Sequence, residues 1–592
     1  MSTAVSAQAP PAASGSFRWL IVPDDPAVEP SRDLVGGKAW SLWRMRSLGL
    51  RVPPAFVVTT EACAAYFAGG EQLPDGLADE LAAGIRLLEQ QLARTFGGGE
   101  RPLLVSVRSG AAISMPGMMD TILDLGCTDE VERALAAETG DPAFAAEVHR
   151  RFSCFYGRLV LGCTEELDEL PDTAAVRAAI LEDTGESVPT DPWEQLRGAV
   201  AAVFASSRSR RSVAYRKHYG IPDDLGTAVT VQAMVFGNLD DDSGTGVLFS
   251  RSPVTGAREP YGEYLPRGQG EDVVSGRVTP KPLEHLKDTH PAVYDELIAA
   301  ADRLDREGAD AQDIEFTVQR GELFLLQSRP AKRTARAAVR IAVALVDEGA
   351  ITPAQAVRRV TAEQIRTLLR PTLTEGAADG AELLASGTSA CPGVATGLAV
   401  ATPEEAQTTP NAILVRRSTS PDDVHGMIAA AAVVTEQGGT TSHAAVVSRA
   451  LDTACVVGCG AGTVDRLVGR IVTVDATGGK VYAGELPTSA ATEASDDDLR
   501  RLAEWATAQA PIQVLAPGAD APGPVFDADE LPPDELGEEL PEIPAGTKTV
   551  RGAVFTTPEG VRAALRSGVA AIVAEHRLPV LLAAIEHSGG TS

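Results

Sequence analysis

A histidine follows two glycines and opens an apolar, alanine-rich run near residue 440. The stretch reads VVTEQGGTTSHAAVVSRA over residues 433–450. The pattern predicts a strand ending at Thr435, a glycine turn, and a helix over residues 444–450 with Ser442 as its N-cap. The positive end of a helix disfavours the imidazolium form and stabilises a new negative charge. A lone histidine is usually structural, but the placement of His443 is typical of a neutral nucleophile.

Charged residues with strand spacing lie further upstream, in DIEFTVQRGELFLLQSRP at residues 313–330. Strand side chains alternate between faces, so Asp313 shares a face with Glu315, and Gln327 shares one with Arg329. A three-residue loop at 320–322 would set Asp313 opposite Arg329 and Glu315 opposite Gln327, whereas a two-residue loop would separate the pairs. Two carboxylates suit a Mg²⁺ ion that bridges triphosphate oxygens, and an arginine suits the remaining phosphate charge. The alternative is a solvated polar hairpin.

Two further basic residues lie beside sequence features that favour phosphate binding. VGGKAWSLWRM, residues 35–45, places two glycines before Lys38 at a predicted helix start, where free backbone amides lie beside a cation. VSVRSGAAISMPGMMDTILDLG, residues 105–126, places Arg108 on a strand before a loop with glycine and methionines. Arginine binds phosphate oxygens well. Each signal alone is weak, because most glycine pairs are turns and most arginines are surface residues.

Composition excludes several classes of protein. A length of 592 residues predicts three to five domains, and a net charge of -29 disfavours nucleic acid and anionic membranes as partners. The seven cysteines form no CxxC pair, which favours a reducing cytoplasm over a disulfide framework. The first residues resemble a loose tail rather than a signal peptide, and no apolar run approaches the roughly 18 residues of a membrane span.

Strand-like and helical runs alternate from residue 17, which predicts a multidomain α/β and α+β protein. Nine stretches between residues 31 and 486 resemble the pyruvate phosphate dikinase family of PEP-utilising enzymes, in that family's order. They are GGKAWSL, SVRSGAAISMPGMMDTILDLG, PWEQLRGAV, GIPDDLGTAVTVQAMVFGN, DSGTGVLFSRSPVTG, YGEYLPRGQGEDVVSG, QDIEFTV, LQSRPAKRTARAAV and GGTTSHAAVV.

This resemblance implies an ATP-grasp nucleotide-binding domain followed by a swivelling β/β/α phosphohistidine domain. It implies that His443 is the catalytic residue that carries the phosphoryl group, and that Asp313 and Glu315 hold Mg²⁺. The implied ATP- and phosphate-binding residues are Lys38, Arg108, Gln327 and Arg329. The family's usual GGMTSH differs here by Thr440 in place of methionine, which changes the packing beside the histidine and leaves the nucleophile in place.

The end of the chain departs from the family. Residues 487–592 are too few for the family's PEP- and pyruvate-binding barrel, since such barrels need about 250 residues. Residues 554–576 resemble only the barrel's first strand, helix and strand. We expect a disordered tail at 1–16, a nucleotide-binding domain at 17–335, a helical segment and linker at 336–387, the phosphohistidine domain at 388–486, a helix at 487–512, an acidic, proline-rich disordered linker at 513–547 and a remnant of the barrel start at 548–592.

The sequence leaves three functions open. The first is an ATP-dependent phosphotransferase that phosphorylates its own histidine, with ATP yielding AMP and inorganic phosphate as co-substrate. Its phosphoryl group would pass to pyruvate on a separate barrel subunit or to another acceptor, and an oligomer is compatible with this scheme. The second is a small-molecule phosphotransferase of the rifampicin phosphotransferase type, which the short segment between the two domains disfavours. The third is an ATP-binding regulatory or scaffold protein without turnover.

Overall fold

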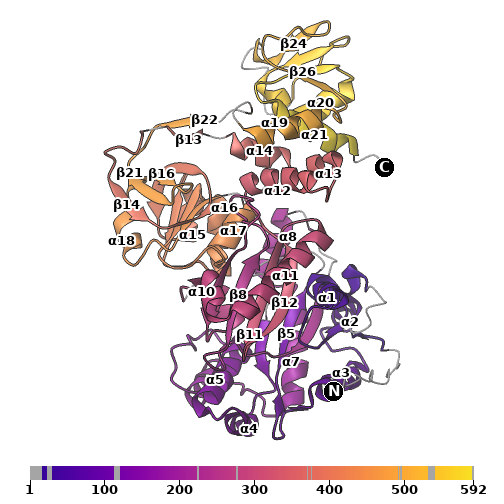
Figure 1. The fold of residues 1–592 in the computed structure, drawn as a ribbon, viewed down its shortest axis with the longest axis vertical. Helices are drawn as coiled ribbons and strands as arrows, with labels where there is room; N and C mark the ends of the chain where they lie inside the picture. The colour runs from indigo at the N-terminus through magenta and orange to yellow at the C-terminus, as the bar shows by residue number, and fades with distance from the viewer. Residues whose placement is uncertain are drawn as a thin grey trace, which may run out of the picture. The chain divides into compact units, whose positions relative to one another are not determined.

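The computed structural model describes twelve stretches of the chain (Figure 1), namely residues 17–22, 30–111, 121–219, 221–222, 226–274, 278–369, 371–374, 376–451, 453–490, 493, 496–530 and 540–589. The chain divides into two compact units, Met1–Val235 and Phe236–Ser592. Both units mix helices with sheets, which confirms the prediction of a mixed α/β protein. Among the described residues, no helix is long and apolar enough to cross a bilayer.

A five-stranded antiparallel sheet with the order β1-β2-β7-β5-β6 is the centre of the first unit. Its strands are β1 (Leu20–Ile21), β2 (Ala55–Val58), β5 (Val105–Gly110), β6 (Thr121–Leu125) and β7 (Ala228–Ala233), and a separate two-stranded sheet holds β3 (Thr95–Phe96) and β4 (Pro102–Leu103). Strands β2 and β7 are buried along their whole length, as their runs of valine and alanine require.

Between these strands in the sequence, the first unit has eight helices among its described residues. They are α1 (Arg32–Ser47), α2 (Thr60–Ala68), α3 (Leu77–Leu92), α4 (Asp129–Thr139), α5 (Pro142–Leu159), α6 (Thr173–Thr184), α7 (Pro192–Ser206) and α8 (Arg210–Tyr219). Local signals set several helix starts. Asp141 and Asp191 accept hydrogen bonds from the first amides of α5 and α7, and each precedes a proline that is preset for the first helical position.

The second unit begins with a sheet of order β10-β9-β8-β11-β12. Its elements are β8 (Gly244–Phe249), β9 (Tyr261–Pro266), α9 (Gly270–Val274), β10 (Lys281–Pro282), α10 (Glu284–Thr289), α11 (Pro291–Gly308), β11 (Gln312–Gln319) and β12 (Glu322–Pro330). Helix α11 packs against β11 and β12. Neighbouring strands in this sheet are antiparallel, and β11 lies between β8 and β12.

An eight-stranded sheet of order β14-β21-β20-β16-β17-β18-β19-β15 follows. Its elements are β14 (Leu383–Ser386), β15 (Thr388–Cys391), β16 (Val394–Val400), α15 (Pro403–Thr408), β17 (Ile413–Arg416), η1 (Pro421–Asp423), α16 (Val424–Ala429), β18 (Ala432–Thr435), α17 (His443–Leu451), β19 (Ala454–Val457), α18 (Thr463–Leu467), β20 (Ile471–Asp475) and β21 (Lys480–Ala483). Neighbouring residues Val433 and Val434 belong to two different core clusters, because successive strand side chains point to opposite faces. Helix α17 covers one of these clusters with Ala444, Ala445 and Val447.

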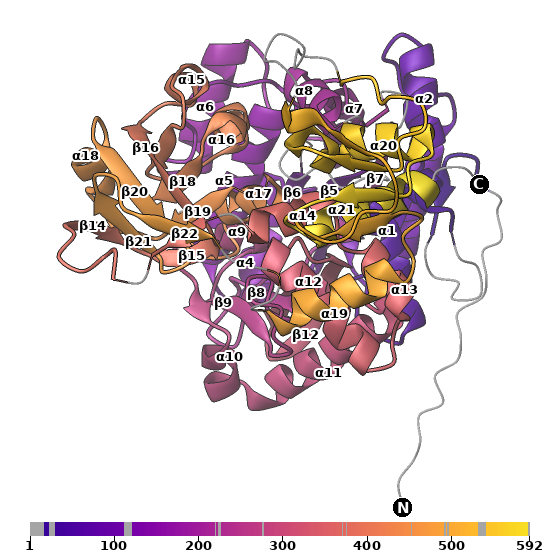
Figure 2. The same cartoon turned by 90° about the horizontal axis from the view of Figure 1, so that it is seen from above.

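The remaining helices and strands of the second unit share one hydrophobic core, although they come from both sides of this domain in the sequence. They are α12 (Ala335–Asp347), α13 (Pro353–Arg358), α14 (Ala362–Leu368), α19 (Asp497–Thr507), β23 (Gln513–Leu515), β24 (Val525–Asp527), η3 (Ala528–Glu530), β25 (Thr549–Arg551), η4 (Ala553–Thr556), α20 (Pro558–Ser567), β26 (Ala571–Val573) and α21 (Arg577–Gly589). Figures 1 and 2 both show α12 to α14 beside α19 and α21. Between the two parts of this core, β13 (Pro371–Leu373) pairs antiparallel with β22 (Thr488–Ala490).

The expected disorder over 513–547 is wrong at the start of that range. Strands β23 and β24 join β25 and β26 in a parallel sheet of order β23-β26-β25-β24. Val514 is buried in the shared core and Phe526 packs against it, so two apolar side chains order a segment whose composition is otherwise acidic and proline-rich. Residues 531–539 of the predicted linker, like the predicted tail 1–16, lie outside the described residues.

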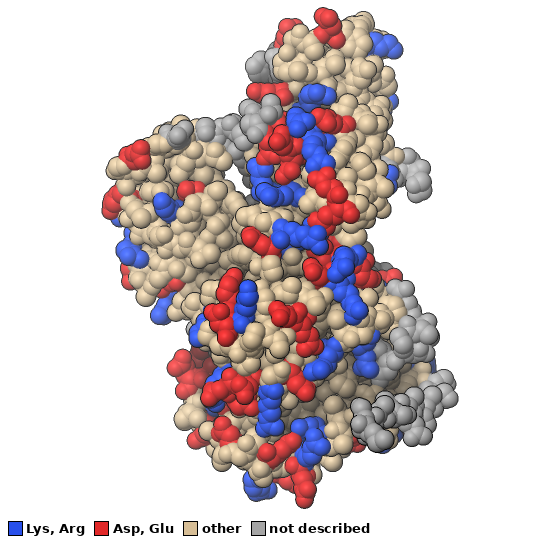
Figure 3. Space-filling view, viewed as in Figure 1, with Lys and Arg blue, Asp and Glu red and all other residues tan. Residues whose placement is uncertain are grey.

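The face of the molecule in Figure 3 shows acidic and basic side chains side by side rather than in separate regions. Ion pairs explain this arrangement on α19, where Arg500 contacts Glu504 at 3.0 Å and Arg501 contacts Asp347 of α12 at 2.5 Å. These exposed pairs contribute little to stability individually. They nevertheless place arginines between the more numerous acidic residues on this face.

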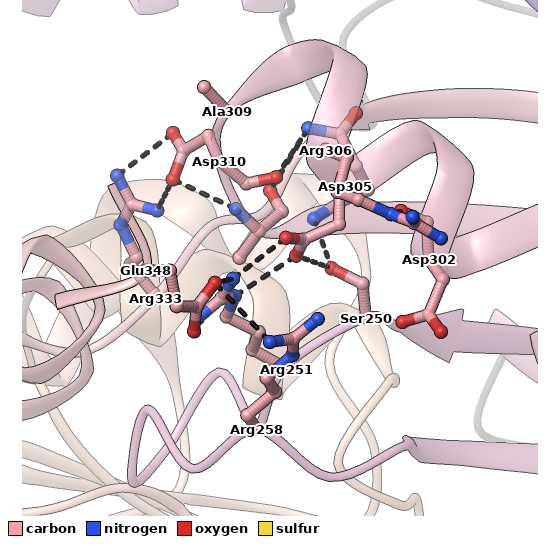
Figure 4. Close-up of polar contacts among 12 residues, drawn as sticks. Ser250, Arg251, Arg258, Asp302, Asp305, Arg306, Ala309, Asp310, Arg333 and Glu348 are labelled. Atoms are coloured by element: carbon pink, nitrogen blue, oxygen red, sulfur yellow. Dashed lines mark hydrogen bonds and ion pairs between the residues drawn. The ribbon is translucent and has the colours of Figure 1, made fainter. Parts of the chain in front are cut away.

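A buried arginine connects the second sheet to helix α12 (Figure 4). Arg251 has a side chain only 1% exposed, and its Nη2 lies 2.8 Å from Oδ1 of Asp305 in α11 and 2.8 Å from Oε2 of Glu348 after α12. Asp305 also accepts a hydrogen bond of 2.6 Å from Ser250. Burial alone would lower the pKa of Arg251, but Glu348 and Asp305 raise it above its ordinary value. The cluster therefore depends on one cation between two carboxylates.

Replacing Arg251 with methionine is expected to lower the free energy of unfolding by about 3–5 kcal/mol, because it leaves buried Asp305 without a cation. Chemical denaturation followed by tryptophan fluorescence and by circular dichroism measures the loss. Arg258→Met is the matched control, since Arg258 is half exposed, lies 3.4 Å from Glu348, and should cost less than about 1 kcal/mol. Equal effects of the two substitutions would contradict the assignment. The double variant Arg251→Met/Asp305→Leu should recover part of the loss.

Candidate phosphoryl-transfer site

His443 is the first residue of α17 and follows β18 through a loop that turns at Gly438. The φ of Gly438 is 103°, a region that favours glycine, which explains the glycine before the histidine. The carbonyl of Ser442 accepts a hydrogen bond of 2.9 Å from the amide of Val446, so Ser442 occupies the N-cap position. Its hydroxyl, however, is buried without a hydrogen-bond partner. The predicted helix start and the N-cap position of Ser442 are confirmed, although the cap is made by its carbonyl and not by its hydroxyl.

The two ring nitrogens of His443 have different surroundings. Nδ1 lies 3.2 Å from Oγ1 of Thr419, whereas Nε2 is buried and has no hydrogen-bond partner in the described part of the chain. Burial lowers the pKa of His443 to about 4, and the carboxylate of Asp423 opposes this shift only in part. Asp423 is itself held by Nη2 of Arg416 at 3.1 Å. The imidazole is therefore neutral near pH 7, mainly through burial and not only through its position on the helix.

Nuclear magnetic resonance of protein labelled with ¹⁵N-histidine tests this state directly. Because the pKa of His443 is about 4, its ring nitrogens are expected to keep neutral-form shifts down to about pH 5. The unfolded chain takes up a proton near pH 6.5, so the linked contribution to stability is present above pH 6.5 and is lost as the pH falls toward 4. Comparison with His443→Asn assigns the signal. A midpoint for His443 near 6.5 would contradict the burial argument.

The loop before His443 is anchored to strand β9 within the second unit. Both carboxylate oxygens of Glu263 accept hydrogen bonds, from the amide and hydroxyl of Thr440 at 3.1 Å each and from the hydroxyl of Thr441 at 2.5 Å. A Cβ on Gly439 would lie 2.4 Å from Oε1 of Glu263, so a larger residue there would displace this carboxylate. Sequence reasoning missed Glu263. The threonine that replaces the family's methionine supplies two of these hydrogen bonds.

The predicted pairing of the charged hairpin is confirmed, but the reason given for it is wrong. Asp313 pairs with Arg329 and Glu315 with Gln327. The turn contains only two residues, Arg320 and Gly321, with φ values of 51° and 73°. A β-bulge restores the pairing, since Glu315 pairs with residue 327 and the next residue, 316, pairs with residue 325. One extra residue in β12 therefore brings the four side chains to their expected partners.

The carboxylate of Asp313 is buried and only half paired. Nε of Arg329 donates to its Oδ2 at 2.8 Å, while Oδ1 is buried without a hydrogen-bond partner. Nη2 of Arg329 lies 3.9 Å from Oε1 of Glu315. Asp313 raises the pKa of Arg329, with a smaller contribution from Glu315, against the effect of burial. A free carboxylate oxygen beside a second carboxylate fits Mg²⁺, whose other ligands are commonly phosphate oxygens and water.

Lys38 and Arg108 belong to the first unit. Helix α1 is kinked at Gly36, where φ is 74°, so Lys38 lies just after a new helical start, as predicted. A Cβ on Gly36 would lie 1.9 Å from the carbonyl oxygen of Gly110, and this close approach sets α1 against the end of β5. Arg108 lies on β5, where its Nη1 donates to Oε1 of Gln232 at 3.4 Å. The predicted loop beyond β5, residues 112–120, lies outside the described residues.

Two family models match the chain. Residues 32–79 and 70–303 match "Pyruvate phosphate dikinase, AMP/ATP-binding domain", and residues 408–479 match "PEP-utilising enzyme, mobile domain". The pyruvate, phosphate dikinase of Clostridium symbiosum is 40% identical over 546 residues, which cover 86% of this chain. The matched residues are those of the nucleotide-binding and mobile domains of the pyruvate phosphate dikinase family. The match to the mobile domain contains His443 and Thr419, and the match to the nucleotide-binding domain contains Lys38, Arg108 and Glu263.

Other dikinases match to a similar extent. The enzyme of Rhizobium meliloti is 41% identical over 528 residues, and pyruvate, phosphate dikinase 1 of Zea mays is 41% identical over 531 residues. These matches cover 81% and 82% of this chain. The chain spans 62%, 58% and 56% of the lengths of the Clostridium, Rhizobium and maize dikinases respectively. The similarity therefore covers most of this chain and little more than half of each dikinase.

Proposed function

We propose that the chain is an ATP-dependent phosphotransferase in which His443 takes a phosphoryl group from ATP. ATP yields AMP, and inorganic phosphate is the co-substrate. In this proposal the nucleotide domain is an ATP-grasp fold and the domain with His443 is a swivelling β/β/α domain. The observation that supports it most is the state of the imidazole, which is neutral, bound at Nδ1 and free at Nε2.

The ring nitrogen Nε2 is the atom that attacks phosphorus in this proposal. A proton on Nδ1 is donated to the hydroxyl oxygen of Thr419, which leaves the lone pair of Nε2 for attack on phosphorus. The N–P bond forms at Nε2 as a P–O bond of the nucleotide breaks. The negative charge of Asp423 partly opposes the lowering of the pKa of His443, so it stabilises positive charge on the ring after attack. Thr419 and Asp423 thus orient the ring and stabilise it.

The phosphate oxygens of ATP require cationic and polar partners. We assign Lys38, Arg108, Gln327 and Arg329 to this role. Asp313 and Glu315 would hold Mg²⁺, which neutralises phosphate charge when bound. The unpartnered oxygen of Asp313 supports this assignment.

The acceptor in this proposal is pyruvate, bound on a separate barrel subunit, or another small molecule that the mobile domain reaches. The curated relatives are dikinases, which favours this function over a rifampicin-type phosphotransferase. A reducing cytoplasm remains our prediction for its location, and it agrees with seven buried cysteines, none of which forms a disulfide.

Labelling with radioactive ATP tests the proposal. With Mg²⁺ and inorganic phosphate, ATP carrying ³²P at the β position is expected to give an acid-labile, alkali-stable label on the protein together with AMP. ATP labelled at the α position is the control and should leave no label. Absence of label from β-labelled ATP over a range of Mg²⁺ and phosphate concentrations would contradict the proposal. Addition of pyruvate and a barrel-containing dikinase fragment then tests the acceptor.

A further inference from the structure

A buried arginine in the helix of His443 has two N–H groups without acceptors. Arg449 is 3% exposed. Its Nη1 donates to the carbonyls of Thr440 at 2.9 Å and Ala390 at 3.3 Å, while Nε and Nη2 have no hydrogen-bond partner among the residues that the structure describes. Burial lowers the pKa of Arg449, which reflects the cost of a buried cation. Buried charges are normally paired, so an anion is the expected missing partner.

The surroundings of Arg449 point to the candidate nucleotide site. Its guanidinium carbon lies 5.7 Å from the ring centroid of Phe249 on β8, and Phe249 is the Cα partner of Asp313. The titratable groups that act on Arg449 include Tyr261 of β9 and Asp313 of β11. The carbonyl that Arg449 holds belongs to Thr440, in the loop anchored by Glu263. The guanidinium is therefore next to the sheet that carries the proposed metal-binding carboxylates.

We propose that Nε–H and Nη2–H of Arg449 bind non-bridging oxygens of the phosphoryl group while it passes to Nε2 of His443. These two donors lie on one edge of the guanidinium, which matches two phosphoryl oxygens. The inference rests on the proposed function and adds to it a phosphate-binding residue from the mobile domain. The N–P bond forms, AMP leaves with the electrons of the broken P–O bond, and inorganic phosphate takes the outer phosphoryl group as pyrophosphate.

One consequence separates this role from a structural one. His443 and Arg449 lie on the same helix, so the nucleophile and the cation reach the nucleotide together. In the proposed swivelling cycle, ATP binds to the nucleotide domain while the domain of His443 is turned away, and it does not then contact Arg449. Loss of the guanidinium should therefore slow transfer to His443 and leave the affinity for ATP unchanged.

Single-turnover labelling with β-labelled ATP measures the transfer rate, and equilibrium binding measures affinity. Arg449→Met is expected to slow labelling about 100-fold, the effect of losing one preorganised donor group, with the dissociation constant for ATP unchanged. Arg449→Lys should recover part of the rate, because it keeps the charge and loses the forked geometry. Arg466→Met is the matched control, since Arg466 is exposed on α18 of the same domain, and it should label at the wild-type rate.

A sulfur substitution distinguishes contact from support of the loop. ATP with sulfur at a non-bridging β oxygen slows transfer in the wild type, and the two diastereomers report the two oxygens. If Arg449 binds one of them, the effects of sulfur and of Arg449→Lys are less than multiplicative for that diastereomer. Fully multiplicative effects for both diastereomers, or labelling of Arg449→Met at the wild-type rate, would overturn the inference. Absence of label in the wild type would instead overturn the proposed function. Should Arg449→Met fail to fold, the lysine variant with the sulfur series decides.

Discussion

Replacing His443 with asparagine is expected to abolish phosphorylation of the protein by ATP while ATP binding is retained. Asparagine fills part of the ring's space and keeps a polar group near Oγ1 of Thr419, but it has no nitrogen lone pair that attacks phosphorus. The loss is complete because no other group supplies the nucleophile in this mechanism. Acid-labile ³²P on the protein and the dissociation constant for ATP, measured side by side, check both halves of the prediction.

A second histidine in the same domain provides the control. The side chain of His425 on α16 is 44% exposed and lies 3.5 Å from Glu404, so His425→Asn should label at the wild-type rate. The labelling rate of Thr419→Val should lie between those of His443→Asn and His425→Asn, because this variant keeps Nε2 and loses the hydroxyl that orients Nδ1. Stoichiometric, acid-labile label on His443→Asn would show that another residue receives the phosphoryl group, and peptide mapping would identify it.

Asp313→Asn is expected to slow labelling of His443 by roughly 10²–10³-fold, because a neutral amide replaces the carboxylate proposed to bind Mg²⁺. The substitution keeps the shape of the side chain and removes the partner of Arg329, whose Nε lies 2.8 Å from Oδ2. Single-turnover labelling over a series of Mg²⁺ concentrations is the measurement. We expect the labelling rate to depend less on the Mg²⁺ concentration, and we expect higher Mg²⁺ concentrations to restore this rate only in part.

Asp310→Asn is the matched control for this substitution. Asp310 pairs with Arg333 close to the start of β11 and has no part in the proposed site. It should therefore leave the rate and its Mg²⁺ dependence unchanged. If Asp313→Asn matched the wild type at every Mg²⁺ concentration, the proposed metal-binding role of the hairpin would be wrong, while the role of His443 would stand.

Periodic patterns allowed the local parts of the site to be predicted. Alternation placed Asp313 and Glu315 on one strand face, and the glycine pair before His443 predicted the helix that begins there. The pairing across the hairpin depended on a bulge near residue 326 that alternation alone does not indicate. A two-residue turn and a bulge together give the same partners as the longer loop, so the sequence led to correct contacts through an incorrect turn.

Long-range contacts could not be predicted in the same way. Glu263 and Thr440 are 177 residues apart, and a single glutamate on a strand gives no local signal that a distant loop binds it. Arg449 resembles an ordinary basic residue in the last turn of a helix, and only its burial distinguishes it. The acidic segment after residue 513 was misjudged because composition was averaged over it, although Val514 and Phe526 are enough to join a sheet.

The pairing of β13 with β22 would limit the movement that we propose for the domain of His443. The chain leaves the helical body through β13 and returns through β22, and the two strands pair as an antiparallel ribbon. In the proposed swivelling mechanism, the two connections would therefore bend or twist as one unit. Such a stalk would restrict the histidine to an arc and keep its effective concentration high at either end of that arc. Delivery of the phosphoryl group would then depend on the flexing of one short ribbon.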